Sequence, residues 1–290
     1  MHATTTVAEP TIGRPPAAGR PEAVAPAVKP IPPALGWLEQ IAGMAILTAQ
    51  TIRTAATPPY SWGWEFLDQC WLCVKRAFIP LMFCTAVFSW GAPGITGGSI
   101  ISTLATPDRL GAFAIMASVR ELATWINGMV IAGVVGTAIC SDLGARKIRE
   151  ELDALAVLGT DVVKTLIVPR FLALGVMTVL FNYWNTMISI VFQMVADITV
   201  WHQSSAGFIA TFSSNFTIAE IVGNGVKVLS FGFIIAIVSC YKGINAKGGA
   251  AGVGRAVNQA VVVSFVLIYV YNYMINAVLL AAFPQTATLR

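Results

Sequence analysis

Five predominantly apolar stretches of this chain contain no Asp, Glu, Lys or Arg, and they constrain the fold more than any other feature. They span residues 77–107, 122–141, 171–196, 228–241 and 256–289. A helix that crosses the hydrocarbon core of a membrane needs about 20 predominantly apolar residues. Four of the stretches are long enough without extension, so the sequence predicts membrane spans at these places.

The fourth stretch is too short to cross a membrane unless its helix begins earlier. Extending it back through Lys227 to about Ile218 provides the missing length. All five runs are too long and alternate too weakly in polarity to be barrel strands, so each span is expected to be a helix. Only 11% of the residues are charged, and the mean hydropathy is +0.73. We therefore expect an all-α integral membrane protein with five transmembrane helices.

The first 33 residues differ in composition from the rest of the chain. They hold eight of the 15 prolines and lack the continuous apolar core of a signal peptide. We expect a disordered Pro/Ala-rich cytosolic tail at residues 1–33. Residues 34–76 mix apolar, aromatic and charged side chains, which suggests interfacial and elbow helices before the first span. Residues 77–285 then form the transmembrane domain.

The basic residues predict the orientation, because Lys and Arg are enriched in short cytoplasmic segments. With a cytoplasmic N-terminus and five spans, all but four of the 18 basic residues fall on the cytoplasmic side. The exceptions are Arg109, Arg120, Lys227 and Arg290. The C-terminus is therefore expected outside. This bias also accounts for the net charge of +4 without nucleic-acid binding.

Residues 146–161 gather seven charged side chains between the second and third spans. Ile148, Leu152 and Leu155 recur there at helical spacing, which predicts one amphipathic helix with an apolar stripe and a charged surface. A cytosolic helix of this kind between two spans can serve as the contact for a partner protein.

Catalytic or metal chemistry is the weaker interpretation of this chain. Glu150, Glu151 and Asp153 would have to converge from several elements to bind a metal, yet they share one predicted helix with three basic residues. Cys70 and Cys73 have the C-x-x-C spacing of redox and metal sites, but they lie in a tryptophan-rich helical segment. Free cysteines that serve as small apolar residues are the better interpretation.

Glycine residues occur at several positions in or beside two of the predicted spans. The segment Gly91–Gly98 is dense in Gly and Pro and predicts a loop or kink, so the first span either ends before it or resumes after it. In the second span, Gly128, Gly133 and Gly136 favour close helix packing, because small residues let helix backbones approach each other in lipid.

Polar residues occur in or beside two spans. Arg120 and Glu121 are adjacent opposite charges near the outer end of the second span, and they either line a polar passage or lie at the interface. Asn182 and Asn185 share one face of the third span, which favours hydrogen bonds between helices over ligand contact. Residues 197–217 are expected to be a polar external connection.

A glycine-rich segment, Tyr241–Arg255, separates the last two spans. Gly249, Gly252 and Gly254 have the spacing G-x-x-G-x-G, which is the reverse of the dinucleotide-binding fingerprint G-x-G-x-x-G. The phosphate-binding motif G-x-x-x-x-G-K-[ST] does not occur in the chain. We therefore expect a sharp cytosolic turn packed on a neighbour, and not a nucleotide-binding loop.

The motifs around these segments resemble one family. The charged segment reads Glu150-Glu-Leu-Asp-Ala-Leu-Ala-Val-Leu-Gly-Thr-Asp161 and is followed by Val168-Pro-Arg-Phe-Leu-Ala173. The glycine-rich turn and Thr137-Ala-Ile-Cys-Ser-Asp-Leu-Gly144 add to the pattern. Together they resemble the signatures of the MlaE/YrbE permeases over about residues 65–283. Glu65-Phe-Leu-Asp-Gln-Cys-Trp71 is similar to the A-type YrbE paralogues of actinobacterial (mycobacterial) MCE operons.

The resemblance implies a permease subunit of an ABC transporter in the inner membrane. It implies pairing with a B-type YrbE paralogue, an ABC ATPase dimer docked on the cytosolic side, and MCE proteins on the outer side. The cargo is expected to be a lipid: a fatty acid, a sterol or a phospholipid. The chain itself needs no catalytic residue and no cofactor, because ATP and Mg²⁺ bind the partner ATPase.

The resemblance also implies roles for particular residues. Coupling to the ATPase is assigned to Arg146, Ile148, Glu150, Glu151, Leu152, Asp153, Leu155, Gly159 and Asp161. The conserved cytosolic turn comprises Lys242, Gly243, Gly248, Gly249, Gly252, Gly254 and Arg255. A lipid path is assigned to Arg120, Glu121 and Asn127.

This chain departs from the family pattern in the second span. Relatives often have Glu-Leu-Gly-Pro where this chain has Glu121-Leu-Ala-Thr124. Val134 stands at a position where the family pattern has a basic residue. We expect a largely apolar cargo cavity without buried clusters of charge. The alternative function is a membrane anchor for an MCE surface complex that transports nothing.

Overall fold

The computed structural model describes residues 36–58, 60, 62–104, 106 and 109–282. These residues form helices and connecting turns, and none of them lies in a strand. The chain separates into two units, Met1–Glu39 and Gln40–Arg290, and the account below concerns the second. The tail predicted at residues 1–33 lies outside the described residues.

Five helical segments in the described part of the chain are long and apolar enough to cross a membrane. They are Gly63–Thr103, Leu110–Ile148, Val163–Trp201, Ile218–Ile244 and Gly249–Ala282. The all-α fold with five candidate spans is therefore confirmed. The fourth segment begins at Ile218, as the length argument requires.

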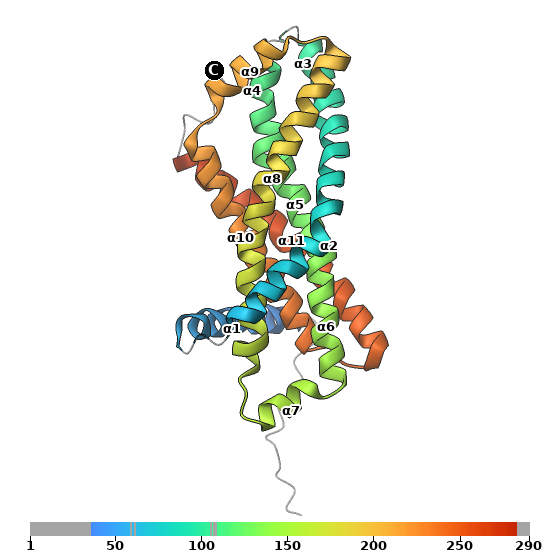
Figure 1. The fold of residues 1–290 in the computed structure, drawn as a ribbon, viewed down its shortest axis with the longest axis vertical. Coiled ribbons are helices and arrows are strands. Elements are labelled where there is room, and N and C mark those ends of the chain that lie inside the picture. Colours follow the sequence, from blue (N-terminus) through green and yellow to red (C-terminus); the bar gives the residue numbers. More distant parts are fainter. Residues whose placement is uncertain (1–35, 59, 61, 105, 107–108, 283–290) are drawn as a thin grey trace, which may run out of the picture. The chain divides into compact units, whose positions relative to one another are not determined.

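Several of these segments change between α-helical and π-helical (η) turns along their length. Figure 1 labels the α-helices. In chain order the elements are α1 (Gly36–Ala56), α2 (Gly63–Ser89), η2 (Trp90–Gly97), α3 (Gly98–Thr103), α4 (Leu110–Ala114), η4 (Ile115–Leu122), α5 (Ala123–Ile131), η5 (Ala132–Gly136), α6 (Thr137–Ile148), α7 (Glu151–Val157), η6 (Val163–Ile167), α8 (Val168–Trp201), α9 (Ser205–Asn215), α10 (Ile218–Ile244) and α11 (Gly249–Ala282).

The loop or kink predicted at Gly91–Gly98 does not interrupt the helix. This segment is π-helical and joins α2 to α3 as one continuous candidate span. Gly94, Gly97 and Gly98 serve close packing instead of chain reversal, whereas Gly91 faces open space. A Cβ on Gly94 would collide with Ala196 of α8. The indole Nε1 of Trp201 donates a hydrogen bond to the Gly94 carbonyl at 3.1 Å, which fixes this contact.

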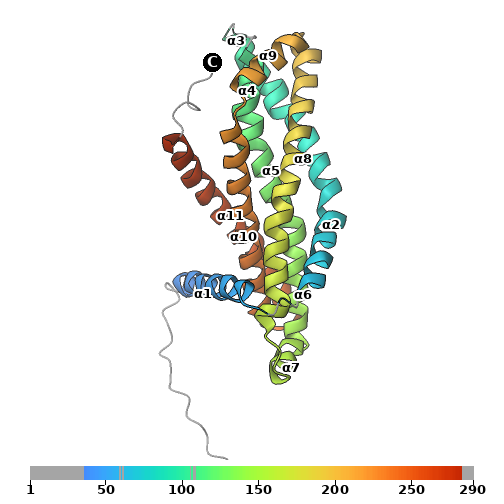
Figure 2. The same ribbon diagram turned by 60° about the vertical axis from the view of Figure 1, so that its left-hand side comes forward.

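The third span is the centre of the fold. α8 packs along α2 on one side and along α10 on the other, and α10 packs in turn on α6 and α11 (Figures 1 and 2). Met44 and Leu47 of α1 join the same apolar core. α7 lies at the opposite end of these helices from α3 and α9. α11 is the least buried of the candidate spans.

A row of buried polar residues along α8 ties it to its neighbours. Asn185 donates to the Ala123 carbonyl at 2.6 Å and accepts from Thr85, so the predicted interhelical bonding is confirmed for this residue. Ser189 bonds Ser89 at 2.8 Å. Asn182 is equally buried, but its Oδ1 has no partner within the described part of the chain.

The predicted glycine packing in the second span holds at two of three positions. A Cβ on Gly128 would lie 3.2 Å from Phe231, and one on Gly136 would lie 2.9 Å from Ser239, so both permit close approach of α10. Gly133 has open space around it.

The connection expected at residues 197–217 contains the helix α9, which packs on α4 through Phe208.

Candidate functional site

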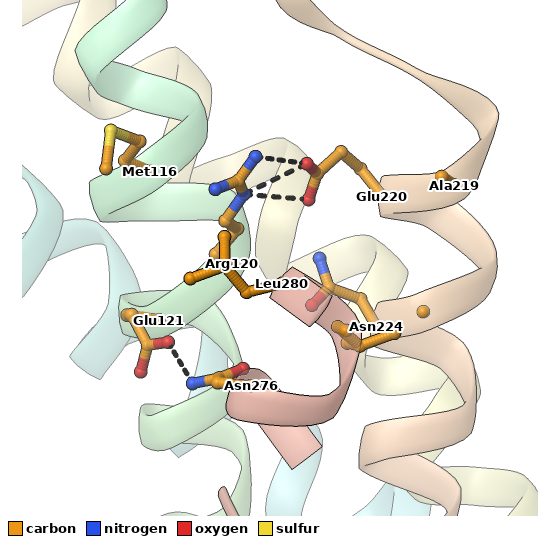
Figure 3. A pocket seen from close by; sticks show the side chains of 10 residues that line it. Met116, Arg120, Glu121, Ala219, Glu220, Asn224, Asn276 and Leu280 are labelled. Atoms are coloured by element: carbon orange, nitrogen blue, oxygen red, sulfur yellow. Dashed lines mark hydrogen bonds and ion pairs between the residues drawn. The ribbon is translucent and has the colours of Figure 1, made fainter. Parts of the chain in front are cut away.

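A pocket of about 320 Å³ opens between η4, α10 and α11, in the part of these helices away from α7 (Figure 3). Apolar walls are contributed by Met116, Leu279 and Leu280. Charged and amide side chains line the same pocket. An amphipathic pocket of this kind can hold a molecule with a polar head and an apolar tail.

Arg120 forms the central ion pair of the pocket with Glu220 of α10. Its Nε lies 2.9 Å from Oε1 and 3.0 Å from Oε2 of the carboxylate, and Figure 3 shows the two groups facing each other. The Glu220 side chain is only 8% exposed. A buried carboxylate needs such a partner, because an unpaired charge would lose its hydration without compensation.

The neighbouring Glu121 turns to a different helix. Its carboxylate accepts hydrogen bonds from Asn272 at 3.0 Å and Asn276 at 2.5 Å, both on α11, and from Trp125 at 2.8 Å. The wider turn of the π-helix η4 accompanies this divergence of adjacent side chains, and π-helical turns frequently occur at functional sites. η4 thus contacts α10 and α11 through consecutive residues.

Lys227 of α10 completes the polar cluster and is 1% exposed. Its Nζ donates to the Arg120 carbonyl at 2.5 Å and to Asn276 at 3.2 Å, and it lies 4.0 Å from Glu121. We call the four charged residues Arg120, Glu121, Glu220 and Lys227 the outer charge cluster, after the side of the membrane on which the basic residues predict this end of the spans. The expectation that this chain lacks buried charge clusters is therefore wrong, because the buried Glu220 and Lys227 lie beside the partly exposed Arg120 and Glu121.

The structure brings together only part of the predicted lipid path. Arg120 and Glu121 line the pocket, whereas Asn127 is fully buried and donates to the Thr178 carbonyl at 2.8 Å. Sequence reasoning missed Glu220 and Lys227. A signal was present: Lys227 is one of the few basic residues outside the segments predicted to be cytoplasmic, and the fourth span must include it.

The periodicity predicts that the charged segment between the second and third spans is one helix. The structure shows two helices instead. α6 ends at Ile148, and Glu150 adopts a left-handed conformation with φ of 59° before α7 begins. Leu152 is 5% exposed and Leu155 packs on the core, as the apolar stripe requires. Ile148, however, belongs to α6 and is exposed.

The charges of this segment form local ion pairs. Lys147 binds both carboxylate oxygens of Asp153 at 2.9 Å and thereby joins α6 to α7. Arg149 pairs with Glu151 at 2.7 Å. Asp161 accepts from the Val163 backbone N–H at 2.9 Å, next to η6. Arg146 pairs with Asp142 of α6, and Gly159 has a φ of 75° in the turn after α7.

The glycine-rich turn is a tight helical hairpin. Gly248 and Gly249 have φ values of 89° and 65°, a region that residues with a Cβ rarely adopt, and they connect α10 to α11. Lys242 donates to Gln40 at 2.6 Å and to Gln259 at 3.1 Å.

Three further glycines of this hairpin differ in their surroundings. Gly243 packs on α6, where an added Cβ would lie 2.9 Å from the Cys140 carbonyl. A Cβ on Gly252 would collide with the Lys247 carbonyl, whereas Gly254 faces open space. The Arg255 guanidinium lies beside Gly248. The turn is thus packed tightly on one side only.

Comparison with known proteins places the chain in a family. The family model described as Permease MlaE matches residues 66–278. A probable ABC transporter permease protein of Rickettsia typhi is 29% identical over 201 residues, covering 69% of this chain and 78% of the relative. A second, from Synechocystis, is 30% identical over 178 residues, covering 61% of this chain and 68% of the relative.

A plant protein is similar as well. Protein TRIGALACTOSYLDIACYLGLYCEROL 1, chloroplastic, of Arabidopsis thaliana is 31% identical over 180 residues, which cover 58% of this chain and 48% of the relative. The family match extends from the first turns of α2 to near the end of α11 and so includes all five candidate spans. This chain is a member of the MlaE family of ABC transporter permeases.

Proposed function

We propose that this chain is the membrane subunit of an ABC transporter that moves a lipid across the inner membrane, driven by a separate ATPase. The observation that carries the proposal is the pocket between η4, α10 and α11, where the outer charge cluster lies beside apolar walls. A lipid has the matching division into a polar head and an apolar tail. The name of the Arabidopsis relative, which contains that of a galactolipid, supports the same cargo class.

α7 provides the contact for the ATPase in this proposal. The helix buries Leu152 against the rest of the fold, and Val157 at its end and Leu158 just after it are strongly exposed, at 88% and 79%. Exposed apolar side chains next to paired charges suit a protein partner. Because α7 is connected to spans at both ends, a partner that moves it also moves those spans. ATP and Mg²⁺ then bind the partner, and this chain contributes no catalytic group.

We further propose that the chain is the A-type YrbE paralogue of an MCE system. It pairs with a B-type YrbE paralogue, and MCE proteins receive or deliver the lipid at the outer side. The N-terminus is cytoplasmic and the C-terminus extracytoplasmic, which places α7 and the glycine-rich turn in the cytosol. The distribution of basic residues supports this orientation.

Purification of the tagged full chain from native membranes tests this proposal. We expect an ATPase, a second MlaE-family permease and MCE proteins to copurify, and lipid extraction of the complex to identify the cargo. A complex that contains MCE proteins but no ATPase would favour the anchor function instead. Recovery of the chain with neither an ATPase nor a bound lipid would overturn the transporter proposal.

A further inference from the structure

The two helices that flank the charged segment 146–161 lie next to different neighbours at this end of the fold. α6 leads into this segment, and α8 follows it after η6. Both helices pack on α10, but α6 also packs on α11 and α8 on α2, and the two have little direct contact with each other. The second span does pack on α8 and α2, but through α5, farther from the charged segment. Close to that segment, a displacement of α7 would therefore reach α6 and α8 separately unless a local contact joined them.

Arg170 provides that contact. Its side chain is 3% exposed, its Nη2 lies 2.7 Å from Oδ2 of Asp142 on α6, and its Nη1 donates to the Leu166 carbonyl at 2.6 Å. The same Nη2 lies 3.9 Å from the Glu65 carboxylate in the first turn of α2. One guanidinium therefore contacts groups on α6, η6 and α2 from its position near the start of α8.

Two further contacts extend this set of interactions. Asp142 also accepts from Arg146, at 3.2 Å, so the first residue of the charged segment is attached to it. Glu65 accepts from Gln69 one turn later in α2, at 2.8 Å. The planar guanidinium can donate in several fixed directions at once, whereas a lysine ammonium would act as a single point charge.

We propose that Arg170 is a positioning residue that makes α6, α8 and the start of α2 move together when the charged segment is displaced. This inference rests on the proposed function, because it concerns how motion of α7 reaches the spans. Without Arg170, α7 still contacts its ATPase, but α6 and α8 respond separately. The expected defect is a loss of coupling and not a loss of assembly.

A distance measurement tests this without knowledge of the cargo. Spin labels are attached to Ser141→Cys on α6 and Val176→Cys on α8, both exposed positions, with the native cysteines replaced by alanine. In the purified complex we expect one narrow distance distribution both without nucleotide and with a trapped ATP analogue. In the Arg170→Met variant we expect a broad or split distribution in at least one of the two states.

Coupling itself is measured in vesicles of phosphatidylethanolamine and cardiolipin with a fluorescent phosphatidylethanolamine as the probe. We expect Arg170→Met to keep most of its ATP hydrolysis and to lose about tenfold in probe moved per ATP, within the usual range of coupling between sites. Asp142→Asn should give a similar loss, and the double variant should be no worse than either single one, because both remove the same interaction.

Ser189→Ala is the matched control, because it removes a buried bond between α8 and α2 away from the charged segment. This variant should lower the thermal stability slightly and leave the amount of probe moved per ATP unchanged. If Arg170→Met does not assemble, Glu65→Gln removes only the contact with α2 and should give a smaller loss. An unchanged distance distribution and ratio in these variants would overturn the role of Arg170. A wild-type complex that hydrolyses no ATP and moves no fatty acid, sterol or phospholipid would instead overturn the proposed function.

Discussion

At the scale of single residues, the outer charge cluster shows how a membrane helix can carry buried charges. Each charged group has a partner from another helix, as in the pairing of Arg120 with Glu220 and of Glu121 with Asn276. Exchange of a buried ion pair for apolar residues is often neutral for stability, whereas removal of one partner is costly. The pair is therefore better explained by a role in binding than by a contribution to folding.

This explanation gives a prediction for Arg120 and Glu220. Glu220→Gln leaves Arg120 without its carboxylate and should destabilise the protein by about 3 kcal/mol. The double variant Arg120→Met/Glu220→Met removes both charges and should regain most of that stability while lipid transport stays lost. Thermal unfolding in detergent and transport in vesicles measure the two effects. Normal transport by a stable double variant would exclude the pair from the lipid path.

At the scale of elements, the sequence predicts the helices better than their breaks. The length argument places the start of α10 at Ile218 because a membrane sets a minimum helix length. The corner between α6 and α7 is not predicted, since Ile148 and Leu152 keep helical spacing across it. The energetic cost of the left-handed conformation of Glu150 is offset by tertiary contacts, namely burial of Leu152 and pairing of Lys147 with Asp153.

The conformation of Glu150 can be tested by substitution. A left-handed residue with a Cβ costs about 1–2 kcal/mol, and glycine avoids this cost but loses more entropy on folding. Glu150→Gly should therefore stabilise the protein by about 0.5–1 kcal/mol, measured by thermal unfolding in detergent. Glu150→Ala should bring no such gain. A loss of stability in the glycine variant would mean that the corner does not form as described.

The exposed surface of α7 gives a second prediction at this scale. Glu151→Lys reverses one charge of the pair with Arg149 and places two basic side chains together. If α7 is the docking surface, this variant should insert normally but fail to take up lipid, whereas the neutral Glu151→Gln should keep partial uptake. Lipid uptake is measured in cells that carry equal amounts of each variant in the membrane. Wild-type uptake by Glu151→Lys would argue strongly against coupling through α7.

At the scale of the whole molecule, the candidate pocket between η4, α10 and α11 has no local signature in the sequence. Arg120 and Glu220 are 100 positions apart, and Asn276 comes from a third helix. The sequence signals only that charges occur in or near spans, because an isolated charge in a membrane needs a partner or water. Which residues become partners depends on helix packing, and packing in turn depends on positions such as Gly94 and Gly128 that hold no charge.

The orientation in the membrane decides whether these parts can work together as proposed. A partner ATPase reaches α7 only from the cytosol, and the helix order then places α9 on the opposite side. In a cysteine-free background, Val157→Cys on α7 should react with a membrane-impermeant maleimide only after the membrane is opened, because the intact cell excludes the reagent. Ser213→Cys on α9, which is also exposed, should react in intact cells. The reverse pattern would put α7 outside, where no ATP is available, and would contradict both the coupling and the cytoplasmic N-terminus that the basic residues predict.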